Sequence, residues 1–157
     1  MKNNFFTFLI LGFFYFSNNA SSDSFNLKSK KIEILKEESQ IIAYEGEAIS
    51  SDKNLEIKSD KFIYKKNLDL LESSGNGRAL IKSEKIRMKF DNATFDQKNQ
   101  NIKANGNLEI FQDDNKFVIK NEEIFYDLKN NIISSNKTTK LEDDKGNTHF
   151  VDSFVFE

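Results

Sequence analysis

One pattern of apolar residues recurs at intervals of 31 residues along most of the chain, and it limits the fold more than any other feature. Five series keep this spacing: Ile57, Met88, Ile119 and Phe150; Phe62, Ala93, Ile124 and Val155; Tyr64, Phe95 and Tyr126; Leu71, Ile102 and Ile133; and Ala79, Ile110 and Leu141. A unit of this length cannot bury its apolar face alone, so the copies must stack and share one core. The chain holds about four and a half copies.

Within each copy, apolar and polar residues alternate with a period of two, which indicates half-buried β-strands rather than helices. The alternation changes phase by one residue at the same place in each copy. Polar pairs mark these places: Asp60-Lys61, Asp91-Asn92 and Glu122-Glu123. A β-bulge or a strand corner produces such a change of phase, so we expect the sheet to bend there.

Turn-forming stretches such as Lys65-Lys66-Asn67 and Asp96-Gln97-Lys98-Asn99 separate the strands, so each copy is predicted to be two strands joined by a short turn. The resulting fold is all-β, with about nine strands of about 5 to 9 residues. These strands fit a jelly-roll-like sandwich of two facing sheets or an open β-solenoid, and the bends favour the first. The fourth copy departs from the pattern, because Asn136-Lys137 stands where glycine is expected.

Residues 1–22 are predicted to be a secretory signal peptide. Lys2 is followed by the apolar run Phe5 to Phe16, which is shorter than the ~20 residues that a membrane-spanning helix needs. Small residues at Ala20 and Ser22 predict cleavage after Ser22, which leaves residues 23–157 as one domain. Export of a chain without cysteine suits a bacterial periplasm.

The composition excludes several classes of protein. The chain has no cysteine and one histidine, His149, so it can build neither a thiol nucleophile nor a multi-histidine metal site. Lys and Arg number 23 against 25 for Asp and Glu, so the chain lacks the excess of positive charge that nucleic-acid binding requires. We therefore expect a protein that is not an enzyme, with no cofactor and no metal.

The strand Ile102-Lys-Ala-Asn-Gly-Asn-Leu-Glu-Ile110 and the corner Ile57-Lys-Ser-Asp-Lys-Phe-Ile-Tyr64 resemble the repeat of the OstA-like family. This family includes the periplasmic lipopolysaccharide-transport protein LptA and the amino-terminal periplasmic domain of LptD, and the resemblance covers roughly residues 25–157. It implies an open β-jelly roll whose apolar interior holds the acyl chains of lipopolysaccharide. It also implies head-to-tail pairing of edge strands, with other Lpt components or with a second copy. Whether the chain stands alone or begins a longer LptD-like protein stays open.

The candidate lining of the lipid groove consists of inward apolar residues: Phe62, Tyr64, Met88, Phe90, Phe95, Leu108, Ile110, Phe117, Ile119, Tyr126 and Ile133. A lipid carrier is reasonable energetically, because each methylene removed from water contributes about 0.8 kcal/mol. The alternative is a structural β-solenoid or filament module, in which the same residues fill a dry core and bind no lipid. Val155 and Phe156 lie in the last, partial copy, where we expect an edge strand open to a partner.

Overall fold

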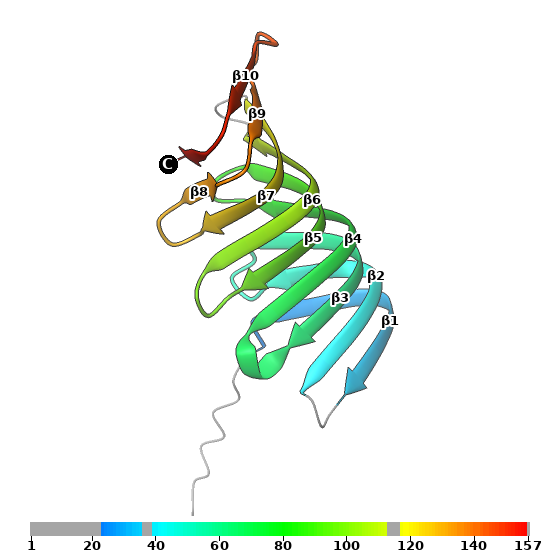
Figure 1. Ribbon diagram of the computed structural model, residues 1–157. Helices are drawn as coiled ribbons and strands as arrows, with labels where there is room; N and C mark the ends of the chain where they lie inside the picture. Colours follow the sequence, from blue (N-terminus) through cyan, green and yellow to red (C-terminus); the bar gives the residue numbers. More distant parts are fainter. Residues whose placement is uncertain (1–22, 36–38, 113–116, 157) are drawn as a thin grey trace, which may run out of the picture.

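The computed structural model describes residues 23–35, 39–112 and 117–156, with the backbone alone at Phe117. The predicted signal peptide, residues 1–22, lies outside the described residues. The strands are β1 (Phe25–Leu35), β2 (Gln40–Ser50), β3 (Leu55–Lys65), β4 (Leu70–Ile81), β5 (Ile86–Asp96), β6 (Asn101–Gln112), β7 (Phe117–Asp127), β8 (Ile132–Ser135), β9 (Thr139–Glu142), β10 (Thr148–Val151) and β11 (Phe154–Phe156), with a 3-10 turn η1 (Lys66–Leu68) between β3 and β4. All eleven strands belong to one antiparallel sheet (Figure 1).

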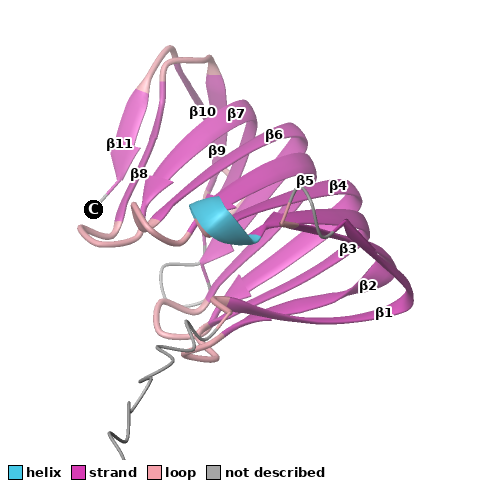
Figure 2. Cartoon of the chain, turned by 90° about the horizontal axis from the view of Figure 1, so that it is seen from below, coloured by secondary structure: helices cyan, strands magenta, loops and turns pink. Residues whose placement is uncertain are grey.

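The sheet is folded over, so that the two halves of each long strand face one another (Figure 2). We call the half that contains residues 25–29, 46–58, 77–90, 108–112, 117–120 and 139–151 the A leg, and the half that contains 31–35, 39–44, 61–74, 92–105, 123–135 and 154–156 the B leg. The legs meet along a corner in the middle of the strands. Their free ends, which carry the turns, form an open seam. Ring contacts between Phe90 and Phe95 and between Phe25 and Tyr64, with centroids 6.0 Å and 5.7 Å apart, join the legs across the interior.

The strands are longer than predicted, at 11 or 12 residues for β1 to β7, because each one continues through the corner. The bend predicted from the phase change is confirmed. The register shifts between Lys58 and Lys61 in β3 and between Lys89 and Asn92 in β5. The extra residue lies on the neighbouring strands β4 and β6. One sheet can therefore build both walls of the fold.

A glycine–asparagine pair forms the bulge in β4 and again in β6. Gly106 and Asn107 both have positive φ values, +73° and 44°, and Gly75 and Asn76 repeat this conformation in β4. The Asn107 amide donates a 2.8 Å hydrogen bond to the carboxylate of Asp91 on β5. Asparagine tolerates the left-handed region and glycine adopts it without a steric penalty, so these residue types favour the corner.

The last copy lacks this pair and its strands are broken. Where the repeat would place glycine and asparagine, the chain has Lys137 and Thr138, and the strand divides into β8 and β9, both of which pair with β7. The next strand is likewise divided, into β10 and β11. Sequence analysis identified the missing glycine, and the strand is broken at that position, between Ser135 and Thr139.

The final strand is also shifted by one residue relative to the repeat. The 31-residue spacing predicts that Phe150 and Val155 point inward, yet they are 71% and 66% exposed. Instead Phe154 pairs with Ser135 and Phe156 with Ile133, and both phenylalanines pack against the core. A shift of one residue moves every side chain of a strand to the other face, so this expectation was wrong for β10 and β11.

Candidate functional site

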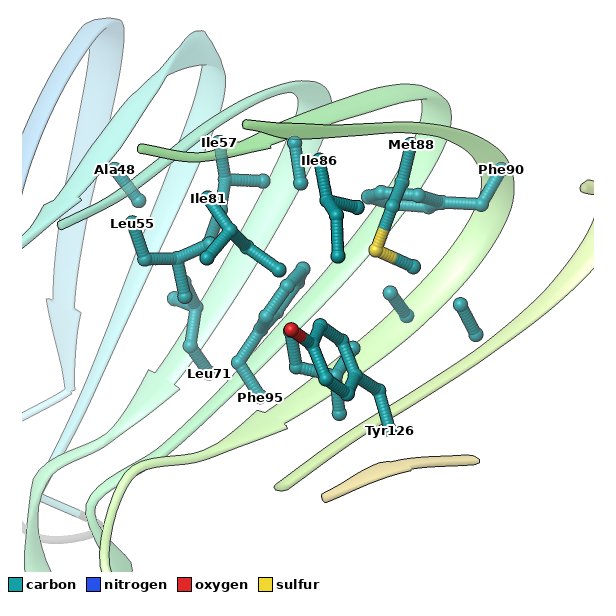
Figure 3. Packing of buried hydrophobic residues seen from close by; sticks show 14 of the residues in the cluster. Ala48, Leu55, Ile57, Leu71, Ile81, Ile86, Met88, Phe90, Phe95 and Tyr126 are labelled. Carbon is teal, nitrogen blue, oxygen red and sulfur yellow. The ribbon is translucent and has the colours of Figure 1, made fainter. Parts of the chain in front are cut away.

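Every candidate lining residue whose side chain is described lies in the buried interior. The ten residues, of which Figure 3 labels four (Met88, Phe90, Phe95 and Tyr126), are at most 6% exposed. The eleventh, Phe117, has no described side chain. Met88, Phe90, Leu108, Ile110 and Ile119 line the A leg, and Phe62, Tyr64, Phe95, Tyr126 and Ile133 line the B leg. The repeat therefore brings the predicted residues together on two facing walls.

Each wall contains a row of cross-strand neighbours that runs almost the length of the sheet. The A-leg row is Leu27, Ala48, Ile57, Ala79, Met88, Ile110, Ile119 and Leu141. The B-leg row is Ile41, Tyr64, Leu71, Phe95, Ile102, Tyr126, Ile133 and Phe156. In the middle of the sheet these side chains fill the space between the legs. The interior there is a packed core and not an open groove.

At the β11 end the walls separate and leave an apolar pocket of about 120 Å³. The A leg contributes Ile110, Ile119, Gln112 and Leu141, and the B leg contributes Ile133, Phe154, Val155 and Phe156. Three of these residues were predicted as lining, and two, Val155 and Phe156, as edge residues. Leu141 was missed although it continues the series Ala79 and Ile110. Phe154 belongs to none of the 31-residue series. It faces the interior because β11 is shifted by one residue relative to the repeat.

At the β1 end the B leg exposes apolar side chains of the interior rows. Ile32 pairs with Ala43 and Ile34 with Ile41, and the two isoleucines are 45% and 64% exposed. β1 pairs with β2 only, and β11 with β8 only, within the described part of the chain. Both ends of the folded sheet therefore present a strand edge beside apolar surface.

Two tyrosines place their rings in the core and their hydroxyls at the seam. The Tyr126 hydroxyl donates a 2.6 Å hydrogen bond to the Asn131 side-chain oxygen, and Tyr64 Oη lies 3.4 Å from the carboxylate of Asp69. Burial raises the pKa of both phenols, and the negative charge of Glu84 adds to the effect at Tyr126. These hydroxyls mark where the interior meets water.

The described residues show no group of three or more His, Cys, Asp or Glu side chains arranged to hold a metal ion. No helix among them has the length and hydropathy to cross a bilayer. His149, the single histidine, is exposed in β10. Asp143 accepts hydrogen bonds from the backbone amides of Lys145 and Asn147, so this acidic residue stabilises the turn between β9 and β10.

Two apolar walls that face one another along a single folded antiparallel sheet define an open β-jelly roll with an apolar interior. Residues 52–157 match the model of OstA-like proteins, and the chain belongs to this family. The fold is similar to that of LptH from Pseudomonas aeruginosa, described as the LptA-homologous periplasmic component of the lipopolysaccharide transport device. The TM-score is 0.64 at 11% identity, over 83% of this chain and 97% of that one. No curated protein sequence matches the chain.

Proposed function

We propose that this protein is a periplasmic lipopolysaccharide-binding transport module that holds acyl chains between the A and B legs. The observation that carries the proposal is the pair of continuous apolar rows, which offers a lipid chain a path along the whole sheet. Removal of a ~12-carbon chain from water contributes on the order of 9 kcal/mol. Burial alone can therefore drive binding, and no catalytic group is needed along the path. Family membership and the fold shared with LptH support the same function.

Binding on this path requires movement of the legs. The apolar pocket of about 120 Å³ at the β11 end is well below the ~300–1,000 Å³ of typical ligand pockets. The lining residues between β3 and β7 are at most 6% exposed, so their side chains leave no free channel. Acyl chains would enter at the β11 end and displace the legs as they advance.

We further propose that the sheet edges join partners. The edge of β11, with Val155 exposed and Phe156 beside the pocket, would pair with the β1 edge of a second copy or of another component of the transport device. Such pairing would cover Ile32 and Ile34 and connect the apolar rows of neighbouring modules. An uncovered edge of this kind otherwise promotes aggregation.

Photo-crosslinking with lipopolysaccharide tests the proposed lipid path. A photoreactive residue is placed at Ile119, which lines the pocket, and in a matched variant at Val118, the preceding residue, in the outward phase of the same strand. We expect lipopolysaccharide adducts at position 119 and few at 118. A folded protein that gives no adduct at either position would be a structural module with a dry core, and the transport proposal would be wrong.

The edge is tested separately with a probe at Val155. We expect adducts with a second copy of the chain, and dilution should abolish them. The control probe is at Lys103, on the outer face of the central strand β6. Equal adduct formation at both positions would show unspecific contact and remove the support for edge pairing.

A further inference from the structure

The seam between the legs is the line along which the interior could open to the side. The legs are joined at the corner by continuous strands, so they cannot separate there. In the middle of the seam lies a hollow of about 140 Å³, with Asn54 and Ser83 on the A leg and Gln97 and Gln100 on the B leg. None of the hydrogen bonds described for the residues that line it crosses from one leg to the other.

The β1 end of the seam is different, because two residues that precede β1 bridge it. The Ser24 hydroxyl donates a 3.0 Å hydrogen bond to the carboxylate of Asp69. The Ser24 amide donates a 3.0 Å hydrogen bond to the hydroxyl of Tyr64. Asp23 forms a 2.7 Å ion pair with Lys66. Tyr64, Lys66 and Asp69 all belong to the free end of the B leg.

Ser24 is also anchored on the A leg, and Phe25 after it begins β1. The Ser24 carbonyl accepts a 2.9 Å hydrogen bond from the amide of Ser51, at the end of β2. Phe25, the next residue, is 3% exposed and packs edge-on against the Tyr64 ring. The start of the described chain is therefore held by the A leg and hydrogen-bonded to the B leg, so it connects the two legs across the seam.

We propose that Asp23 and Ser24 form a clasp that holds the seam closed at the β1 end, and that its release lets the legs part. The bridging contacts are polar and partly exposed, so local opening costs far less than unfolding. Cleavage of the predicted signal peptide after Ser22 would leave both clasp residues at the start of the exported chain. The role of the clasp in lipid loading rests on the proposed function, whereas its role in opening does not.

Thiol labelling tests the opening without lipid, because the chain has no cysteine. A reporter is introduced as Ala43→Cys on the B leg, in β2 next to β1. The control is Ala104→Cys at the centre of the sheet, in the same line of cross-strand neighbours, which runs Ala43, Phe62, Ser73, Ala93 and Ala104. Both alanines are 0% exposed. Each cysteine variant is labelled first in the otherwise unchanged chain and then together with the double substitution Asp23→Ala and Ser24→Ala. We expect labelling at position 43 to become about tenfold faster and labelling at position 104 to change less than twofold.

The matched variant Ser24→Thr keeps the hydroxyl and should restore slow labelling at position 43. An unchanged rate at 43 in the alanine variant overturns the clasp. An equal acceleration at both positions also overturns it, because the two residues would then contribute to overall stability and not to a local opening.

A disulfide lock tests whether lipid loading uses this opening. The double variant Ser24→Cys and Asp69→Cys places two thiols where the native oxygens lie 3.0 Å apart. The control pairs Ser24→Cys with Gln100→Cys, one repeat further along, where φ is 52° against 51° at Asp69. With the photoreactive residue moved to Ile57, which pairs with Ala48 of β2 near the clasp, we expect oxidation of the first pair to reduce lipopolysaccharide adducts at least tenfold and a reductant to restore them. Adducts at position 119, in the pocket at the β11 end, should persist.

Undiminished adducts in the oxidised lock would show that loading does not need the seam to open at this end, which overturns the gating role. Absence of adducts in the reduced forms as well would refute the proposed transport function. The labelling result would still decide the clasp.

Discussion

Replacing the corner glycine Gly106 by alanine tests whether the bulge builds the fold. Gly106 has a φ of +73°, and a Cβ built there lies 2.6 Å from the Asp91 carboxylate oxygen and 2.8 Å from its Cβ. The left-handed backbone costs an alanine about 1–2 kcal/mol. Displacing a side chain that is hydrogen-bonded to Asn107 adds about 1–3 kcal/mol. We expect Gly106→Ala to lower the free energy of unfolding by about 2–5 kcal/mol.

Two other glycines separate these contributions. Gly146 has a φ of +80° and no atom within 4 Å of a built Cβ, so Gly146→Ala should cost the backbone term alone, about 1–2 kcal/mol. Gly77 needs no left-handed conformation, but its Cβ would lie 2.0 Å from the Phe90 ring. Gly77→Ala should therefore cost the steric term alone, about 1–3 kcal/mol.

Urea unfolding followed by far-UV circular dichroism measures all three variants. If the reasoning is right, the loss for Gly106→Ala approaches the sum of the other two. A loss no greater than that of Gly146→Ala would mean that Asp91 moves aside freely. The corner would then be held by backbone conformation alone.

Three further predictions concern the core, the seam and the broken strand. Phe95 is 1% exposed, so Phe95→Ala should lower the free energy of unfolding by about 3–5 kcal/mol. Phe111 lies on the outer face beneath the side chains of Arg87 and Lys89, so Phe111→Ala should lower it by only about 1 kcal/mol in the same urea titration. Because burial raises the pKa of Tyr126, the native state keeps the phenolic proton to higher pH than the unfolded chain does. The contribution of Tyr126 to stability should therefore be constant up to pH about 10 and be lost above it. Thermal unfolding measured across alkaline pH should show a less steep fall of stability in Tyr126→Phe. Lys137→Gly with Thr138→Asn should restore the bulge and slow amide hydrogen exchange between β8 and β9; unchanged exchange would show that the break has another cause.

The periodic part of the fold could be predicted from the sequence. A 31-residue spacing in a strand pattern places equivalent residues in one cross-strand row, and this is why Tyr64, Phe95 and Tyr126 share a wall. The phase change located the corner for the same reason. Strand length was underestimated because a bulge and a turn give the same local signal, and only the pairing partners show that the strand continues.

The shift of β11 is explained by the cost of burying a charged residue, which the spacing of apolar residues does not show. The repeat assigns Glu157 to the row of Tyr64, Phe95 and Tyr126, where a carboxylate would have to leave water. Moving the strand by one residue places Phe156 opposite Ile133 instead, at the expense of exposing Phe150 and Val155. The clasp was not predictable either, since Ser24 and Asp69 are 45 residues apart and no pattern links them.

The corner and the seam together determine how such a sheet can open. Because β1 to β7 each belong to both legs, separation of the walls is a rotation about the corner, and the Gly–Asn bulges restrict that rotation through their hydrogen bonds with Asp60 and Asp91. The A and B rows then move apart most at the seam, where the tyrosine hydroxyls and polar turns already meet water and lose little on opening. Under the proposed function, an alkyl chain that entered between the rows would give the separated apolar side chains a new packing partner, so the open state would be favourable only when occupied. The packing that closes the empty interior would then make its opening depend on an apolar ligand.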